Sequence, residues 1–570
     1  MTSGLRYASR TGRWVLAATV LGSGMAALDA TVVGIALPAI GRDFHASVAS
    51  MQWVVDGYTL PLAGLLLLGG ALGDAFGRRK MFMIGTVWFA LASLACGLAP
   101  DAGFLIGARA VQGAGAALLT PGSLAILQAS FAPEDRSKAI GAWSGLGGVA
   151  TAIGPFLGGW LISAVSWRLV FFINLPLAAA VLAVSARHVP ETRAPGPRQP
   201  LDVPGAIFIS LALAGITNGL IGASSDGWTS LFVLVNLLAG VGLLVAFCVT
   251  EVTSDHAMLP LSIFRTRQFS AANGVTFVVY GALGGALFLV PVVLQEVCRY
   301  SALEAGMALL PVTVIMLTLS ARSAALSARI GPRLQMTVGP LVIAAGMALF
   351  ARVHGSGDYL TQVLPAVVAF GFGAAINVAP LTATALAAAP AEHSGIASAV
   401  NNDVARAASL IAVAVLPPLA GITGDAYLHP AALTRGFHTA VLIAAAFAAA
   451  GGILAAATIR NPPRYPAPAE PGAPGAETGP APGDETVRGL HCGLDAPPLR
   501  GGISGNSGIK GATQKEALAR SAVRRLSPVT EMANASVDFC AYLVIFPVQA
   551  WVTAESRTSS WWTIRSVVAS

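Results

Sequence analysis

Three ionisable residues in the first half of this 570-residue chain stand inside long apolar stretches, namely Asp29, Asp56 and Arg109. A charge at the centre of a membrane-spanning helix costs about 2.5–3.5 kcal/mol, so such residues suggest a function. A carboxyl group in these surroundings can bind and release a proton. A second carboxyl nearby favours its protonated form, whereas a nearby arginine favours its charged form. The residue types therefore predict proton exchange, with a static salt bridge as the structural alternative.

Another charged group lies in the segment Gly70–Lys80 (GALGDAFGRRK), which separates two apolar runs. It contains Asp74, Arg78, Arg79 and Lys80. Basic residues between two hydrophobic segments are typical of a cytoplasmic connection in a membrane protein. Glycines in the same segment allow a tight turn. We therefore predict a short cytoplasmic connection here.

The second half of the chain has fewer charges that could do chemistry. Asp403 and Arg406 are three residues apart, so a helix would place them on one face. We predict that this candidate pair neutralises itself. We expect Glu296, Arg299 and Glu304 to lie in a solvated connection.

The elements that position these residues are long apolar runs. Of all residues, 55% are hydrophobic and only 11% are charged, whereas soluble domains have about 25% charged residues. A membrane-spanning helix needs about 20 apolar residues, and β-barrels show shorter alternating segments instead. We therefore predict an all-α integral membrane protein with fourteen spans. The spans are near 14–37, 51–71, 81–99, 103–129, 139–164, 168–187, 203–222, 229–250, 270–295, 303–325, 334–352, 362–388, 396–421 and 436–458.

The distribution of Lys and Arg predicts the orientation of these spans. Most basic residues fall in the connections on the side of the N-terminus, and few fall in the others. Because basic connections stay cytoplasmic, we expect both termini inside. At about 1.5 Å per residue, Asp29, Asp56 and Arg109 would lie about 8–12 Å below the outer ends of their spans. They would then share one depth.

The chain also has a weak internal repeat. Leu72, Gly77 and Arg79 recur at the same spacing as Leu326, Gly331 and Arg333, with Ala328 at the place of Asp74. Repeated halves are how many transporters are built, with the substrate site between them. We predict two six-helix bundles related by a pseudo-twofold axis. The expected organisation is a cytoplasmic N-terminus (1–13), a first bundle (14–187), linkers with two inserted spans (188–269), a second bundle (270–458) and a disordered cytoplasmic tail (459–570).

The fifth predicted span is rich in glycine and includes Gly154, Pro155, Gly158 and Gly159. Such a density would destabilise a soluble helix. In a membrane it allows close helix packing and a bend at the proline. We predict a role in conformational change.

Four motifs in order resemble the major facilitator superfamily, in particular its fourteen-span drug:proton antiporter branch (EmrB/QacA type). They are Leu28–Pro38 in the first span, the loop with Gly70, Leu72, Asp74, Gly77, Arg78 and Arg79, the group of Arg109, Gln112, Gly113 and Gly115, and the segment Gly154–Gly159. The chain departs from the pattern at Gly34, Ala75 and Ala150, where the family usually has an asparagine, a basic residue and a glycine.

The resemblance implies that the protein exports small amphipathic or hydrophobic compounds, such as drugs or antibiotics, in exchange for protons by alternating access. Asp29 and Arg109 would take part in proton coupling, with Asp56 as a further candidate. Gly70, Asp74, Gly77, Arg78 and Arg79 would form a cytoplasmic gate, and the span-five motif would mark an exporter. The expected location is the cell (plasma or inner) membrane, with small molecules, protons and the lipid bilayer as partners.

Other functions find less support in the sequence. A non-antiport importer or uniporter of the same superfamily is the alternative that stays open. The chain shows no HExxH or GxSxG motif and no metal-spaced His and Cys residues. No lysine follows a glycine, which excludes a phosphate-binding GK motif. We therefore expect no enzymatic activity, no cofactor or metal, and no nucleotide or nucleic-acid partner. We expect a proton gradient to drive the protein.

Overall fold

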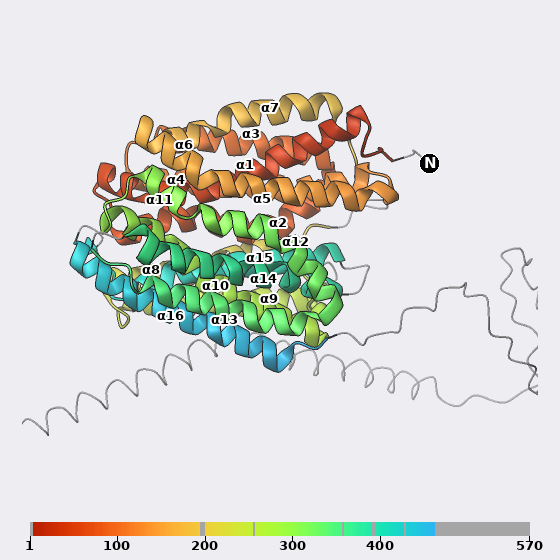
Figure 1. The fold of residues 1–570 in the computed structure, drawn as a ribbon. Helices are drawn as coiled ribbons and strands as arrows, with labels where there is room; N and C mark the ends of the chain where they lie inside the picture. Colours follow the sequence, from red (N-terminus) through yellow and green to blue (C-terminus); the bar gives the residue numbers. More distant parts are fainter. Residues whose placement is uncertain are drawn as a thin grey trace, which may run out of the picture. The chain divides into compact units, whose positions relative to one another are not determined.

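The computed structural model describes residues 4–461 except 194–199, 255–256, 356–357, 390–393 and 427–428. Within these residues the elements are helices, and the only strand-like feature is an isolated bridge between Leu5 and Phe131 (Figure 1). The elements are α1 (Arg10–Phe44), α2 (Val48–Phe76), α3 (Arg78–Gly97), α4 (Ala102–Ser130), α5 (Pro133–Ala164), α6 (Leu169–Phe172), α7 (Asn174–His188), α8 (Val203–Asp226), α9 (Leu231–Thr253), η1 (Leu261–Arg265), α10 (Arg267–Glu296), α11 (Ala302–Ala308), α12 (Leu310–Ile330), α13 (Pro332–Phe350), η2 (Tyr359–Val363), α14 (Leu364–Ala387), α15 (Ser394–Leu419) and α16 (Pro430–Thr458). The predicted tail lies outside the described residues beyond Asn461.

Fourteen helical segments of the described chain are long and apolar enough to cross a membrane, which confirms the predicted spans. Three spans are built from two helical segments each. The sixth is α6 followed by α7, the tenth is α11 followed by α12, and the twelfth is η2 followed by α14. In the sixth and tenth spans the break precedes Pro176 and Pro311, because a proline cannot donate a backbone hydrogen bond to the preceding turn.

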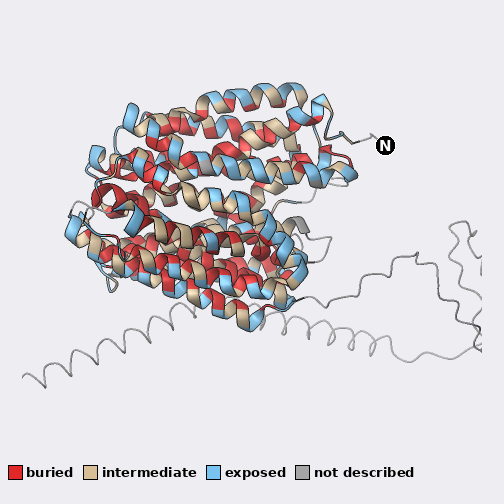
Figure 2. Cartoon of the chain, viewed as in Figure 1, coloured by how far each residue is buried: buried red, intermediate tan, exposed pale blue. Residues whose placement is uncertain are grey.

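The side chains that face outward confirm a multi-pass membrane protein. Leu91 is 63% exposed and Leu238 is 72% exposed. Figure 2 shows such exposed positions along the outer faces of the long helices, with buried positions between the helices. Apolar surface on this scale is unfavourable in water and is suited to contact with lipid.

The helices form two six-span bundles with the same internal contacts. In the first bundle (α1–α7), α1 packs against α5 and α7, and α3 packs against α4. In the second bundle (α10–α16), α10 packs against α15 and α16, and α13 packs against α14. The predicted repeat of the fold is therefore confirmed.

The two inserted spans, α8 and α9, pack against each other. α8 also packs against α2 of the first bundle and α15 of the second. The inserted pair thus lies along one seam between the bundles.

The two ends of the helices are named here by the chain termini. The terminal side is the side where α1 begins and α16 ends, and the far side is the opposite one. Gly77, between α2 and α3, and Gly331, between α12 and α13, both lie on the terminal side. Both have positive φ values, +118° and +86°, a conformation that favours glycine.

Each of these two glycine turns is held by a polar residue that follows the last helix of its bundle. Glu191 accepts hydrogen bonds from the backbone N–H groups of Arg79 and Lys80, both at 3.1 Å. Asn461 Oδ1 accepts one from the backbone N–H of Arg333 at 3.0 Å. The short sequence repeat therefore corresponds to a repeated turn in the structure.

Replacing Gly77 by Ala is expected to destabilise the protein. A Cβ at this position would lie 2.7 Å from Glu191 Oε1 in a backbone with φ of +118°. The left-handed conformation alone costs a non-glycine residue about 1–2 kcal/mol. Thermal unfolding in detergent should show a lower midpoint. Gly73→Ala is the control, because Gly73 is helical and its Cβ would find the nearest atom at 4.0 Å. Equal midpoints for the two variants would contradict this prediction.

Candidate functional site

The first bundle contains a fully buried ion pair between two helices. Asp29 of α1 is 0% exposed and Arg109 of α4 is 1% exposed. Arg109 Nη1 donates to Asp29 Oδ2. Of the two arrangements that the sequence left open, a carboxyl beside an arginine or beside a second carboxyl, the structure has the first.

Neutral side chains complete the hydrogen bonding of the Asp29 carboxyl group. Gln112 Nε2 of α4 and Asn174 Nδ2 of α7 each donate to Asp29 Oδ1 at 2.9 Å. Asn174 Nδ2 also donates to Ser93 Oγ of α3 at 2.9 Å. The site is therefore formed by side chains from four helices of the same bundle. Hydrogen bonds of this kind are what makes a buried ion pair tolerable.

Arg109 has further contacts that fix its guanidinium group. Its Nε donates to the carbonyl oxygen of Val54 at 3.1 Å. Its Cζ lies 4.2 Å from the centroid of the Tyr58 ring, a cation–π contact. Both partners belong to α2, so the charge pair between α1 and α4 is also tied to α2.

Asp56 takes no part in this network. It is 0% exposed, and neither of its carboxyl oxygens has a hydrogen-bond partner among the described residues. It lies one helical turn after Gln52, whose side chain contacts α15 across the seam. Asp56 thus lies within the protein interior, but its carboxyl is separate from the Asp29–Arg109 pair.

Gln52 fastens the two bundles together near the far side. Its Nε2 donates to the carbonyl oxygens of Val413 and Ala414 in α15, at 2.6 and 3.0 Å. These carbonyls lie four residues before Pro417 and Pro418, which have no N–H to offer them. The glutamine therefore satisfies two acceptors that the helix itself cannot use.

Other contacts on the far side also join the bundles. Gln295 Nε2 of α10 donates to the carbonyl oxygen of Ile35 in α1 at 3.0 Å. Arg42 of α1 forms an ion pair with Glu296 of α10. The expectation that Glu296 is solvated was wrong, since the residue is only 7% exposed. The side chain lies at the end of a helix that packs against α1, and Arg42 there provides its partner.

The glycines of α5 divide into a tightly packed group and an open group. In the far half, a Cβ on Gly154 would lie 2.0 Å from Thr31 Oγ1, and a Cβ on Gly159 would lie 2.5 Å from the Ala302 carbonyl oxygen. In the terminal half, a Cβ on Gly141, Gly145 or Gly147 would meet no atom within 4 Å. α5 therefore contacts α1 and α11 closely on the far side, while its terminal half has free space around these glycines.

The sequence profile of the Major Facilitator Superfamily matches residues 19–414. The chain belongs to the major facilitator superfamily. It is 36% identical over 416 residues to the tetracenomycin C resistance and export protein of Streptomyces glaucescens, covering 72% of this chain and 77% of that protein. It is 36% identical over 451 residues to a puromycin resistance protein of Streptomyces alboniger (76% and 88% covered). It is 34% identical over 426 residues to the multidrug resistance protein Stp of Mycobacterium tuberculosis (74% and 78% covered).

Solved structures of distant transporters share the fold of this superfamily member. A bacterial homologue of the human lysosomal transporter Spinster aligns with a TM-score of 0.55 at 17% identity, covering 79% of this chain and 98% of that chain. A D-xylose–proton symporter aligns with a TM-score of 0.54 at 16% identity, covering 79% and 98%. The family and the fold together make the protein a transporter and not an enzyme.

On the terminal side of this major facilitator superfamily transporter, Asp74 and Arg78 form an ion pair, with Arg78 Nη2 2.7 Å from Asp74 Oδ1. Arg78 Nη1 also donates to the Ala125 carbonyl oxygen of α4 at 3.4 Å. Arg79 instead turns to the end of α7, where its Nη1 donates to the Val189 carbonyl oxygen at 3.1 Å. The basic residues of the predicted gate thus have separate partners within one bundle.

The predicted neutralising pair of the second half is not formed in the transporter. Among the described residues no ion pair joins Asp403 to Arg406, and Asp403 Oδ1 is buried without a hydrogen-bond partner. A spacing of three residues sets the common helix face, but the side-chain rotamers decide whether the charged ends meet.

The sequence did not single out Ser93, Asn174, Gln52 or Glu191 for a role. Asn174 and Gln52 are polar residues in or beside apolar runs, which is a usable signal. Ser93 and Glu191 carry no such signal, because a serine is ordinary in a helix and Glu191 lies in a connection.

Proposed function

We propose that this transporter is a proton-coupled exporter of small amphipathic or hydrophobic compounds, such as antibiotics, that works by alternating access. We place it in the cell membrane with the terminal side cytoplasmic. Three relatives at 34–36% identity have names that refer to resistance or export. The observation that carries proton coupling is the buried Asp29–Arg109 pair, the one described ion pair in which both side chains are fully buried.

On this proposal Asp29 binds the coupling proton. Protonation would remove the charge that pairs with Arg109, and breaking a buried pair costs about 3–5 kcal/mol. The helices that carry the pair must therefore rearrange when the proton binds. α1 also contacts α5 through Thr31 and Gly154, and α10 through Ile35 and Gln295. A movement of α1 would thus reach the seam between the bundles.

The remaining candidate residues have supporting parts in this proposal. Asp56 is a second candidate site for a proton, because its buried carboxyl group has no hydrogen-bond partner among the described residues. The Asp74–Arg78 pair, next to the Gly77 turn, belongs to the cytoplasmic gate. Gly154, Pro155, Gly158 and Gly159 allow the close approach of α5 to its neighbours on the far side. Asp403 and Arg406 form no ion pair among the described residues, so we assign them no part in the coupling.

Transport into inside-out vesicles tests the proposal. Vesicles that contain the protein should accumulate ethidium or puromycin when their lumen is acidic, and a protonophore should abolish the accumulation. Vesicles without the protein provide the control. Protein-dependent uptake that is unchanged by the protonophore would instead support the non-antiport alternative.

A further inference from the structure

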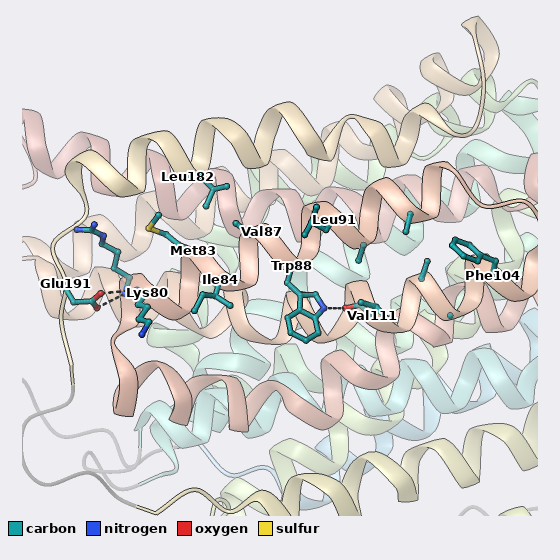
Figure 3. Close-up of a pocket in the computed structure, with 15 residues that line it drawn as sticks. Lys80, Met83, Ile84, Val87, Trp88, Leu91, Phe104, Val111, Leu182 and Glu191 are labelled. Carbon is teal, nitrogen blue, oxygen red and sulfur yellow. Dashed lines mark hydrogen bonds between the residues drawn. The ribbon is translucent and has the colours of Figure 1, made fainter.

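An apolar groove lies on the outer face of the first bundle, between α3, α4 and α7 (Figure 3). It has a volume of about 1110 Å³. Its walls include Ile84, Val87, Trp88 and Leu91 of α3, Phe104 of α4 and Leu182 of α7. These side chains lie on a face that is exposed outside the bundle, so the groove opens toward the lipid and not toward the seam.

The wall of the groove is fixed in place by a hydrogen bond. Trp88 is 46% exposed, and its indole Nε1 donates to the Val111 carbonyl oxygen of α4 at 2.9 Å. Figure 3 shows the ring held across the gap between the two helices. A large side chain that is already anchored loses little freedom when an apolar chain packs against it.

One end of the groove is basic, and the other end is apolar. Arg79, Lys80 and Glu191 line the terminal-side end. Both carboxylate oxygens of Glu191 accept backbone N–H groups, at 3.1 Å. Arg79 and Lys80 together carry two positive charges, and Glu191 carries one negative charge, so this end of the groove has a net positive charge. Lys80 is exposed, whereas the Arg79 guanidinium donates to the Val189 carbonyl oxygen. The ammonium group of Lys80 is thus the cation most open to a ligand.

The part of the groove between Lys80 and Leu91 fits one leaflet of a bilayer, while the lining continues to Ala95 of α3 and to Phe104 near the start of α4. Lys80 and Leu91 are eleven residues apart in α3, which corresponds to about 16 Å at about 1.5 Å per residue. Half of the hydrocarbon core is about 15 Å thick. A ligand that fills this terminal-side part of the groove would have its charge at the membrane surface and its apolar chain within a single leaflet.

We propose that the groove binds an anionic glycerophospholipid from the leaflet on the terminal side. Its phosphate group lies beside Lys80, and one acyl chain lies along Ile84, Trp88 and Leu91. Because the groove has basic residues at only one end, it suits a molecule with an anionic headgroup and an apolar chain better than a wholly apolar molecule. Because Lys80 directly follows Arg78 and Arg79, the lipid headgroup would touch the start of the helix that carries the gate.

Fluorescence of Trp88 tests this site in the full-length protein. The protein is reconstituted in phosphatidylcholine vesicles that contain either brominated phosphatidylglycerol or brominated phosphatidylcholine. The Trp88 signal is the difference between wild type and Trp88→Phe. Brominated phosphatidylglycerol should quench this signal at a mole fraction several-fold lower than brominated phosphatidylcholine does. Lys80→Ala should raise the required mole fraction about fivefold, the effect of one lysine near an anionic membrane surface.

Lys138→Ala is the matched control, because Lys138 is an exposed lysine of α5 on the same side, away from the groove. It should leave the quenching unchanged. Equal quenching by the two brominated lipids, with no effect of Lys80→Ala, would mean ordinary boundary lipid and would overturn the proposal. So would displacement of both lipids by ethidium or puromycin, because the groove would then hold cargo. None of these outcomes depends on proton coupling.

Discussion

Asp29→Asn is expected to reduce proton-driven transport to the level of vesicles that lack the protein. The substitution keeps the shape of the side chain and a hydrogen-bonding oxygen, but it removes the titrating group and leaves Arg109 buried without its counter-ion. The loss of one partner of a buried pair costs about 3–5 kcal/mol, so thermal stability should fall as well. Uptake of ethidium into inside-out vesicles and unfolding in detergent measure the two effects.

The double variant Asp29→Asn/Arg109→Gln separates these effects. Removing both charges eliminates the unpaired cation, so most of the lost stability should return. Transport should stay absent, because no proton can bind at position 29. Recovery of pH-driven uptake in the double variant would show that the pair is only a static salt bridge and that the proton binds elsewhere.

Gly159→Ala is expected to shift the protein away from the arrangement that is closed on the far side. A Cβ here would lie 2.5 Å from the Ala302 carbonyl oxygen, which belongs to the backbone and cannot turn aside. Overpacking costs about 1–3 kcal/mol, which corresponds to about a 5- to 150-fold change in the balance of two arrangements. Spin labels at Leu98 and Leu360, both exposed near far-side helix ends, should report longer distances between the bundles.

Gly145→Ala offers a matched control within the same helix. A Cβ at Gly145 would meet no atom within 4 Å, and alanine is a better helix former than glycine. Its distance distribution should match that of wild type. If both alanine variants gave the same distances, close packing of α5 on the far side would not set the balance.

The spans were predictable because membrane burial demands long apolar runs, and this demand outweighs every other signal in the sequence. Simple helix geometry also placed Asp29 and Arg109 at a similar depth, and the structure pairs them. The same estimate gave Asp56 that depth too, yet its carboxyl has no partner. Depth follows from the rise per residue, whereas the direction of a side chain depends on how each helix is rotated against its neighbours.

The rest of the site depended on contacts between distant parts of the chain. Asn174 reaches Asp29 across 145 positions, and Gln52 reaches Val413 across 361. No local pattern encodes such distances. Glu191 shows the same limit, since its carboxylate holds the start of α3 from a connection far along the chain. The prediction that Asp403 and Arg406 neutralise each other was wrong for the opposite reason. It relied on the local spacing of the two residues, whereas tertiary packing decides whether their side chains meet.

The two carbonyl oxygens that Gln52 satisfies have a consequence for the role of solvent. Pro417 and Pro418 have no N–H group, so the carbonyl oxygens of Val413 and Ala414 lack the usual donors four residues further along α15. When α2 moves away, only water can replace the glutamine, because an unmade hydrogen bond at a buried carbonyl is costly. Separation of the bundles at this point therefore requires hydration of the seam, and the two arrangements differ in the number of waters they bind. Water then acts as a ligand that binds one arrangement of the protein more than the other. Solutes that are excluded from the seam therefore favour the dry, closed arrangement.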